Sequence, residues 1–261
     1  MTPAEFTTTT HPDATLRYGV TDRQVADIFE PENPVDSLVL LLHGGMWREL
    51  DRMRTWAAGR AIAQAGHLVA TIEYRVGTGR WAAALDDLAT AIDQIQLSGR
   101  EWTIHNEAPR TITLIGHSSG GQLALWAAGR HSLPTASRWH TTRNQVTGVV
   151  ALAPAADLQT LHTAGFGEGA VADFLGGSPQ EILDVYAQAD PMELKPTIPV
   201  EILHGSADEV IPVIISEGYV QRHAGARVTL TVVDGVGHTE WGDPQSSAWP
   251  HLLAALTRVA S

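Results

Sequence analysis

Residues 111–121 read Thr-Ile-Thr-Leu-Ile-Gly-His-Ser-Ser-Gly-Gly, a short apolar run followed by a serine between glycines. The apolar run predicts a buried strand over 111–115, and residues 122–129 have the pattern of a helix. A Gly-x-Ser-x-Gly turn between a strand and a helix raises the serine above the sheet on a strained backbone. Side chains at positions 116 and 120 would collide in such a turn. We therefore expect Ser118 to be a nucleophile, and the alternative is a glycine-rich structural turn.

Further apolar runs and helical patterns alternate on both sides of this turn. The expected strands are 15–18, 24–29, 37–42, 68–74, 111–115, 146–152, 200–204 and 228–233, and the expected helices are 51–64, 81–95, 122–129 and 249–259. Several of these strands are apolar almost throughout, as strands buried on both faces should be. Alternating strands and helices predict an α/β fold with a central, mainly parallel, eight-stranded sheet flanked by helices. Ligands bind such sheets at the carboxyl ends of the strands.

The alternation is interrupted between residues 155 and 199. This stretch has several Gly and Pro residues, no convincing strand and short helical pieces such as 179–188. Its position predicts a small helical lid inserted after the sixth strand, and an ordinary long crossover is the alternative. No linker or repeat divides the rest of the chain. We expect a flexible segment over 1–12 and a single domain over 13–261.

Composition narrows the classes of function. The chain of 261 residues has 17 Lys and Arg against 29 Asp and Glu, a net charge of −12, which disfavours nucleic acid and anionic membranes as partners. It has no cysteine, which excludes disulfides, thiolate metal sites and a cysteine nucleophile. No histidine pair has the spacing of a zinc helix, so we expect no metal site. The first residues lack the pattern of a signal peptide, and a cytoplasmic location is expected.

A nucleophilic serine needs a base and an acid to orient it. His238 follows the last expected strand through Asp-Gly-Val-Gly at 234–237, a flexible loop that can carry an imidazole over the sheet. Asp208 follows the preceding expected strand, within the turn 205–212. We expect His238 as general base and Asp208 as the acid that holds its tautomer. Asp157 and Glu209 are the alternative acids.

The strand 37–42 ends in His43-Gly44-Gly45-Met46-Trp47. Consecutive glycines let a chain approach a substrate carbonyl closely and direct amide groups toward it. We expect oxyanion donors at Gly45 or Met46 together with the N–H of Ser119, and His43 as a brace for the loop. We also expect aromatic walls of a substrate pocket at Trp47 and Trp241. The alternative is that these two rings only pack.

With these residues in place, the chain resembles the α/β-hydrolase superfamily from about residue 18 to 256. The order Ser118, Asp208, His238 is that of the superfamily. The stretch His43 to Trp47 resembles the H-G-G-x-W signature of the kynurenine formamidase (arylformamidase) family and of related small bacterial esterases. The resemblance implies cofactor-free hydrolysis of a small ester or N-formyl amide. Acyl transfer, a non-catalytic ligand-binding role and homodimer formation remain open alternatives.

Overall fold

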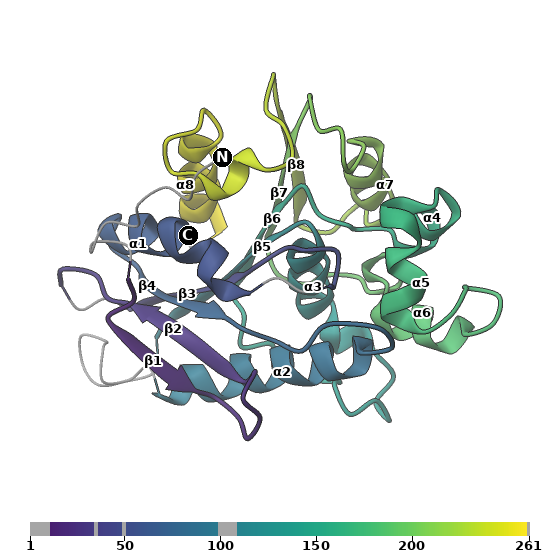
Figure 1. The fold of residues 1–261 in the computed structure, drawn as a ribbon, viewed down its shortest axis with the longest axis horizontal. Coiled ribbons are helices and arrows are strands. Elements are labelled where there is room, and N and C mark those ends of the chain that lie inside the picture. Colours follow the sequence, from purple (N-terminus) through teal and green to yellow (C-terminus); the bar gives the residue numbers. More distant parts are fainter. Residues whose placement is uncertain (1–10, 34–35, 49–50, 99–108, 260–261) are drawn as a thin grey trace.

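The computed structural model describes residues 11–33, 36–48, 51–98 and 109–259, with the side chains of 96–98 left out. Within these residues eight strands form one sheet in the order β1-β2-β4-β3-β5-β6-β7-β8 (Figure 1). The strands are β1 (Ala14–Arg17), β2 (Val25–Phe29), β3 (Ser37–Leu42), β4 (Leu68–Ile72), β5 (Thr111–His117), β6 (Gly148–Leu152), β7 (Val200–Gly205) and β8 (Val228–Val233). β2 is antiparallel to β1 and β4, and the other pairs are parallel. This confirms the expected mainly parallel sheet.

Helices cover both faces of the sheet, as Figure 1 shows. They are α1 (Trp56–Gln64), α2 (Trp81–Ser98), α3 (Ser119–Ala128), α4 (Leu158–Thr163), α5 (Ala170–Leu175), α6 (Leu183–Ala189), α7 (Ile214–Arg222) and α8 (Trp249–Val259). Short 3-10 turns are η2 (Arg52–Thr55), η4 (Arg130–Ser132), η5 (Phe166–Glu168), η6 (Pro191–Glu193) and η7 (Glu240–Gly242).

Alternate residues of the strands enter two separate hydrophobic cores. In β3, Val39 and Leu41 pack into the core under α1 and α8, whereas Leu38, Leu40 and Leu42 pack into the core that includes α2 and α3. Successive side chains of a strand point to opposite faces, so an apolar run with no polar interruption is buried on both sides. The two cores hold the carboxyl ends of the central strands in place, where the candidate residues lie.

The helices differ from expectation in detail. The expected helix 51–64 is divided into η2 and α1, and the Asp51 carboxylate accepts from the Met53 amide at its start. The helix expected over 179–188 begins at Leu183. α7 was not expected, because its sequence has no continuous apolar stripe. Of the expected flexible segment 1–12, residues 1–10 lie outside the described residues.

The segment 155–199 contains α4, η5, α5, α6 and η6, and no strand. It packs against the loop that follows β3. The Phe174 ring stacks on Trp47 with centroids 5.1 Å apart, and Asp173 accepts from Arg48 at 3.0 Å. This helical insertion after the sixth strand therefore contacts the glycine-rich loop directly. Its movement as a lid stays a prediction. In the described part of the chain, no helix combines the length and apolar character needed to cross a bilayer.

Candidate active site

Ser118 lies in the sharp turn between β5 and α3, with φ 56° and ψ −118°. Its strained backbone is anchored on both sides: its N–H donates to Leu152 O at 2.9 Å, and its carbonyl accepts from Ala155 N at 3.1 Å. The flanking glycines are required by close approach. A Cβ atom at Gly116 would lie 2.2 Å from Gly120 O, and one at Gly120 would lie 2.4 Å from His43 O. Strain that the surroundings enforce in this way is characteristic of functional sites.

His238 and Asp208 are brought together from two different loops. His238 Nδ1 donates a hydrogen bond of 2.7 Å to Asp208 Oδ2. The Asp208 side chain is fully buried and that of His238 is 9% exposed. The bond leaves Nε2 as the free ring nitrogen of His238. It also fixes the ring's tautomer, because a carboxylate oxygen accepts the proton that Nδ1 carries.

A second histidine supports the same carboxylate. His204, at the end of β7, is fully buried, and its Nε2 lies 3.3 Å from Asp208 Oδ2 and 2.8 Å from Ile211 O. The other oxygen of Asp208 accepts from the amides of Val210 and Ile211, each at 2.8 Å. Burial opposes ionisation of Asp208, but the hydrogen bonds from His204, His238 and the Ile211 amide hold its pKa well below its usual range. Asp208 is therefore a carboxylate whenever the protein is folded near neutral pH.

The alternative acids lie elsewhere. Asp157 begins α4, where its carboxylate accepts from the amide and hydroxyl of Thr160 at 2.8 and 2.7 Å. Its role is that of a helix N-cap. Glu209 is exposed to solvent beside Asp208. In the described structure neither carboxylate contacts His238.

Ser118 and His238 line the same cavity of about 410 Å³. Its other lining residues are Leu41, Leu42, His43, Gly44, Gly45, Met46, Arg54, Thr55, Ala58, His117, Leu152, Thr239, Trp241, Gly242, Asp243 and Leu252. Most of these come from the β3 loop, η2, α1, the turn around η7, and α8. No residue of 155–199 is among them, so the described cavity does not lie under the predicted lid. In the described structure no hydrogen bond joins Ser118 Oγ to His238, and the two side chains share the cavity without direct bonding.

Of the three candidate oxyanion donors, Gly45 and Met46 line the cavity with Ser118, and Ser119 follows it in the chain. Gly45, Met46 and Trp47 have positive φ angles of 127°, 55° and 55°, which turn the loop sharply after β3. Ser119 is the first residue of α3. Within the described residues, the backbone N–H groups of Gly45, Met46 and Ser119 form no hydrogen bond. Unpaired amides beside a buried serine hydroxyl are available to a developing negative charge.

The two candidate pocket tryptophans differ in position. Trp241 lines the cavity and is buried, with its indole N–H unpaired among the described residues. Trp47 does not line it: its indole stacks on Phe174, and its Nε1 donates to Gln122 Oε1 at 2.9 Å. The structure thus places Trp47 in the core between the β3 loop and α5, away from the Ser118 cavity. The ring turns inward because the loop backbone reverses at Met46 and Trp47.

The sequence motifs did not predict three contacts near the site. His117 Nε2 donates to the backbone carbonyl of His238 at 2.8 Å. His204 supports Asp208 from the end of β7. Glu73 lies 3.7 Å from His43 Nε2 and belongs to a buried charged network. Among the described residues, no group of three or more His, Asp or Glu side chains is arranged to hold a metal ion.

Comparison with protein families places this geometry in context. The model of the BD-FAE family matches residues 26–222. A probable isoprenylcysteine alpha-carbonyl methylesterase from rice (Oryza sativa subsp. japonica) is 26% identical over 244 residues, 85% of this chain and 57% of the relative. A kynurenine formamidase from Drosophila melanogaster is 27% identical over 125 residues, 47% of this chain and 40% of the relative. The chain therefore spans about half the length of the curated relatives that it matches.

Solved structures share the fold over nearly the whole chain. A truncated carbohydrate esterase from gut microbiota superposes with a TM-score of 0.79 at 21% identity, covering 97% of this chain and 98% of that one. The propionate-bound esterase Est2 of Thermogutta terrifontis superposes with a TM-score of 0.72 at 21% identity, covering 94% and 92%. At this level of identity the likeness establishes the fold.

Proposed function

The chain belongs to the BD-FAE family, and we propose that it is a serine hydrolase that cleaves a small carboxylic ester or an N-formyl aryl amide. Ser118 is the nucleophile, His238 the general base and Asp208 the acid that orients His238. The proposal rests chiefly on the 2.7 Å hydrogen bond between His238 and Asp208 at the cavity that also holds Ser118. The esterase and formamidase relatives and the esterase-like fold support it.

The mechanism is acyl transfer in two steps. His238 Nε2 takes the proton of Ser118 as the oxygen attacks the substrate carbonyl, and Asp208 stabilises the resulting imidazolium. The amides of Gly45 or Met46 and of Ser119 hold the oxyanion. His238 then protonates the leaving alcohol or amine. Water, deprotonated by His238, hydrolyses the acyl-enzyme and releases the acid and Ser118.

The volume of the cavity limits the size of the substrate group that it can hold. Its volume of about 410 Å³ and its apolar side chains Ala58, Leu152, Trp241 and Leu252 suit a short or medium acyl or aryl group. Trp241 forms one wall in this proposal. Arg54 and Asp243 are exposed lining residues and leave the cavity rim charged with both signs.

A substrate panel on purified protein tests the proposal. We expect Ser118-dependent turnover of p-nitrophenyl acetate, p-nitrophenyl butyrate or N-formylkynurenine, and its loss in Ser118→Ala. Turnover of the formamide in preference to the esters would favour a formamidase. Activity in Ser118→Ala equal to the parent would contradict the proposal.

Two rival functions give different results in the same assay. An acyltransferase would convert the ester to a new ester or amide when an alcohol or amine is added, at the expense of the free acid. A non-catalytic binding protein would turn over none of the three substrates. Product analysis with added acceptors separates these outcomes from hydrolysis.

A further inference from the structure

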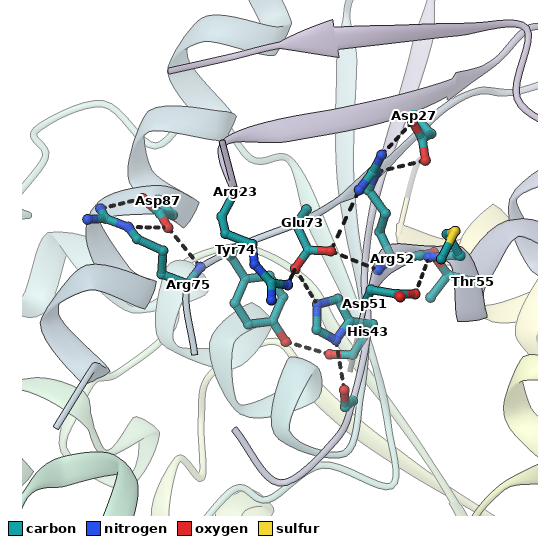
Figure 2. A network of polar contacts seen from close by, with 12 residues as sticks. Arg23, Asp27, His43, Asp51, Arg52, Thr55, Glu73, Tyr74, Arg75 and Asp87 are labelled. Atoms are coloured by element: carbon teal, nitrogen blue, oxygen red, sulfur yellow. Dashed lines mark hydrogen bonds and ion pairs between the residues drawn. The ribbon is translucent and has the colours of Figure 1, made fainter. Parts of the chain in front are cut away.

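A buried network of charged side chains lies next to His43, the first residue of the glycine-rich loop 43–47 (Figure 2). The side chains of Asp27 on β2 and Glu73 just after β4 are only 1% and 2% exposed. Arg52 connects them: its Nε lies 2.7 Å from Asp27 Oδ2, its Nη1 3.7 Å from Glu73 Oε2, and its backbone amide donates to Glu73 at 3.2 Å. Burying a charge costs several kcal/mol unless a partner offsets it, and Arg52 is the shared partner of both carboxylates.

Glu73 faces the loop from the centre of this network. Figure 2 shows its carboxylate between Arg23, Arg52 and the His43 ring. Its Oε1 accepts from Arg23 Nη1 at 3.1 Å and lies 3.7 Å from His43 Nε2. Burial alone would favour the neutral acid, but contact with His43, the Arg52 amide and Arg23 lowers the pKa of Glu73 below its ordinary value. Glu73 therefore presents a negative charge to the imidazole.

His43 in turn holds two consecutive peptide groups of the loop. Its Nδ1 donates to Gly44 O at 2.8 Å, while its own carbonyl accepts from the Tyr74 hydroxyl at 2.5 Å. The Tyr74 ring also stacks on the imidazole, with centroids 4.4 Å apart. The ring is thus stacked on one face by Tyr74 and bonded at Nδ1 to Gly44, while Nε2 faces the Glu73 carboxylate at 3.7 Å without a hydrogen bond among the described residues.

The hydrogen bond from His43 to the Gly44 carbonyl determines the direction in which the Gly45 N–H points. In a trans peptide the C=O and the following N–H point in opposite directions, and the described chain has no cis peptide bond. Fixing the Gly44 carbonyl toward His43 therefore fixes the Gly45 N–H away from His43. Gly44 itself lies close to the nucleophile, since a Cβ atom added there would be 3.2 Å from Ser118 Cβ.

We propose that Glu73 is a positioning residue that acts through His43 to aim the Gly45 N–H at the oxyanion. Asp27 and Arg52 keep the Glu73 carboxylate in place from β2 and η2. The inference rests on the proposed function, because Gly45 is an oxyanion donor only within that mechanism. Glu73 contacts neither substrate nor reacting atoms.

The test compares Glu73→Gln with Glu201→Gln. Glutamine keeps the size of glutamate but removes its charge. Glu201 is a matched control because it is also mostly buried and accepts from an arginine, Arg258, at 2.7 Å. It is the second residue of β7, whereas the candidate site lies at the carboxyl ends of the strands. Any loss common to both variants therefore measures the cost of a missing buried ion pair alone.

We expect Glu73→Gln to lower kcat for p-nitrophenyl acetate by about tenfold or more, because a misaimed donor loses transition-state stabilisation. KM should change by less than about threefold, since the ground-state ester is bound by the cavity walls. Affinity for a trifluoromethyl ketone, which forms the tetrahedral adduct, should fall in parallel with kcat. Glu201→Gln should keep the kcat of the parent.

A double-mutant cycle shows whether the effect passes through His43. In a His43→Ala background, adding Glu73→Gln should lower kcat by less than about twofold, because the link is already broken. Glu73→Asp, which retains the charge at a shorter reach, should recover part of the kcat lost in Glu73→Gln. If Glu73→Gln fails to fold, the same comparison between Glu73→Asp and Glu201→Asp decides the question.

Failure of this inference is distinguishable from failure of the proposed function. A fluorophosphonate probe that labels Ser118 in the parent, together with unchanged kcat and ketone affinity in Glu73→Gln, would overturn the inference alone. Additive losses in the double-mutant cycle would do the same. Absence of Ser118 labelling in the parent would reject the proposed function and the inference with it.

Discussion

His117 Nε2 donates a hydrogen bond of 2.8 Å to the backbone carbonyl of His238. The residue before the nucleophile is thus tied to the loop that carries the base. Because a carbonyl oxygen can only accept, the proton of a neutral His117 must be on Nε2. The two rings also lie together, with centroids 4.7 Å apart. The turn that raises Ser118 and the loop that brings His238 over the sheet are held in a fixed relation by this contact.

The burial of His117 predicts a dependence of stability on pH. Burial lowers the pKa of His117 from 6.5 to about 4, although the hydrogen bond to the His238 carbonyl opposes the shift. The unfolded chain therefore binds a proton more readily than the folded chain in this interval. The contribution of His117 to stability is full above pH 6.5 and is lost as the pH falls toward 4, by on the order of 1–3 kcal/mol.

The variant His117→Asn removes this titration and keeps a side-chain N–H for the His238 carbonyl. Its melting temperature should therefore fall less steeply than that of the parent as the pH is lowered through this interval. Thermal unfolding followed by circular dichroism at several pH values measures both slopes. Equal slopes in the two proteins would contradict the role given to His117.

Asp208→Asn should lower kcat by on the order of 10⁴-fold, because an amide stabilises the wrong tautomer of His238 and cannot stabilise the imidazolium. KM should change little. The adjacent exposed carboxylate provides the control: Glu209→Gln should keep the activity of the parent. Steady-state kinetics on both variants decide the assignment. Comparable losses in the two variants would show that Asp208 has no special role.

Gly120→Ala should damage both the fold and the site. The added methyl group would lie 2.4 Å from His43 O and 2.6 Å from Leu42 O, both of them backbone atoms that cannot move independently. We expect a loss of about 2–4 kcal/mol in the free energy of unfolding, together with reduced kcat. Gly218→Ala is the control. Position 218 in α7 has open space, so alanine there should maintain or raise stability in urea unfolding.

Ala58→Leu should shorten the acyl group that the enzyme accepts. Ala58 is buried in α1 and lines the cavity that holds Ser118. A larger side chain there removes volume from the apolar wall, so kcat/KM for p-nitrophenyl butyrate should fall more than kcat/KM for p-nitrophenyl acetate. An unchanged ratio between the two esters would indicate that the acyl group occupies another part of the site.

The sequence was sufficient to predict the sheet and the order of the candidate residues. β3 and β8 have the expected bounds, because each is an uninterrupted run rich in β-branched or leucine residues with turn residues on both sides. Asp208 and His238 follow two strands that are neighbours in the sheet, and the carboxyl ends of parallel strands meet at one edge. Their proximity follows from the topology.

Other contacts depend on packing that no local pattern records. Asp27, Arg52 and Glu73 are far apart in the chain and meet because β2 pairs with β4, with Asp27 opposite Thr71. Glu73 lay inside the expected strand 68–74, whereas β4 ends at Ile72. Trp47 points into the core because of positive φ angles at two non-glycine residues, which the motif does not reveal.

The formation of an acyl-enzyme on Ser118 tests the central claim most directly. The protein is mixed with p-nitrophenyl acetate, quenched in acid before turnover is complete and digested for mass spectrometry. The account predicts one acetyl group on the peptide that contains Ser118, and none in Ser118→Ala. In His238→Ala the acetyl group should form far more slowly than in the parent, because the base needed for acylation is missing. Turnover at the parent rate in Ser118→Ala, or acetylation confined to another residue, would contradict it.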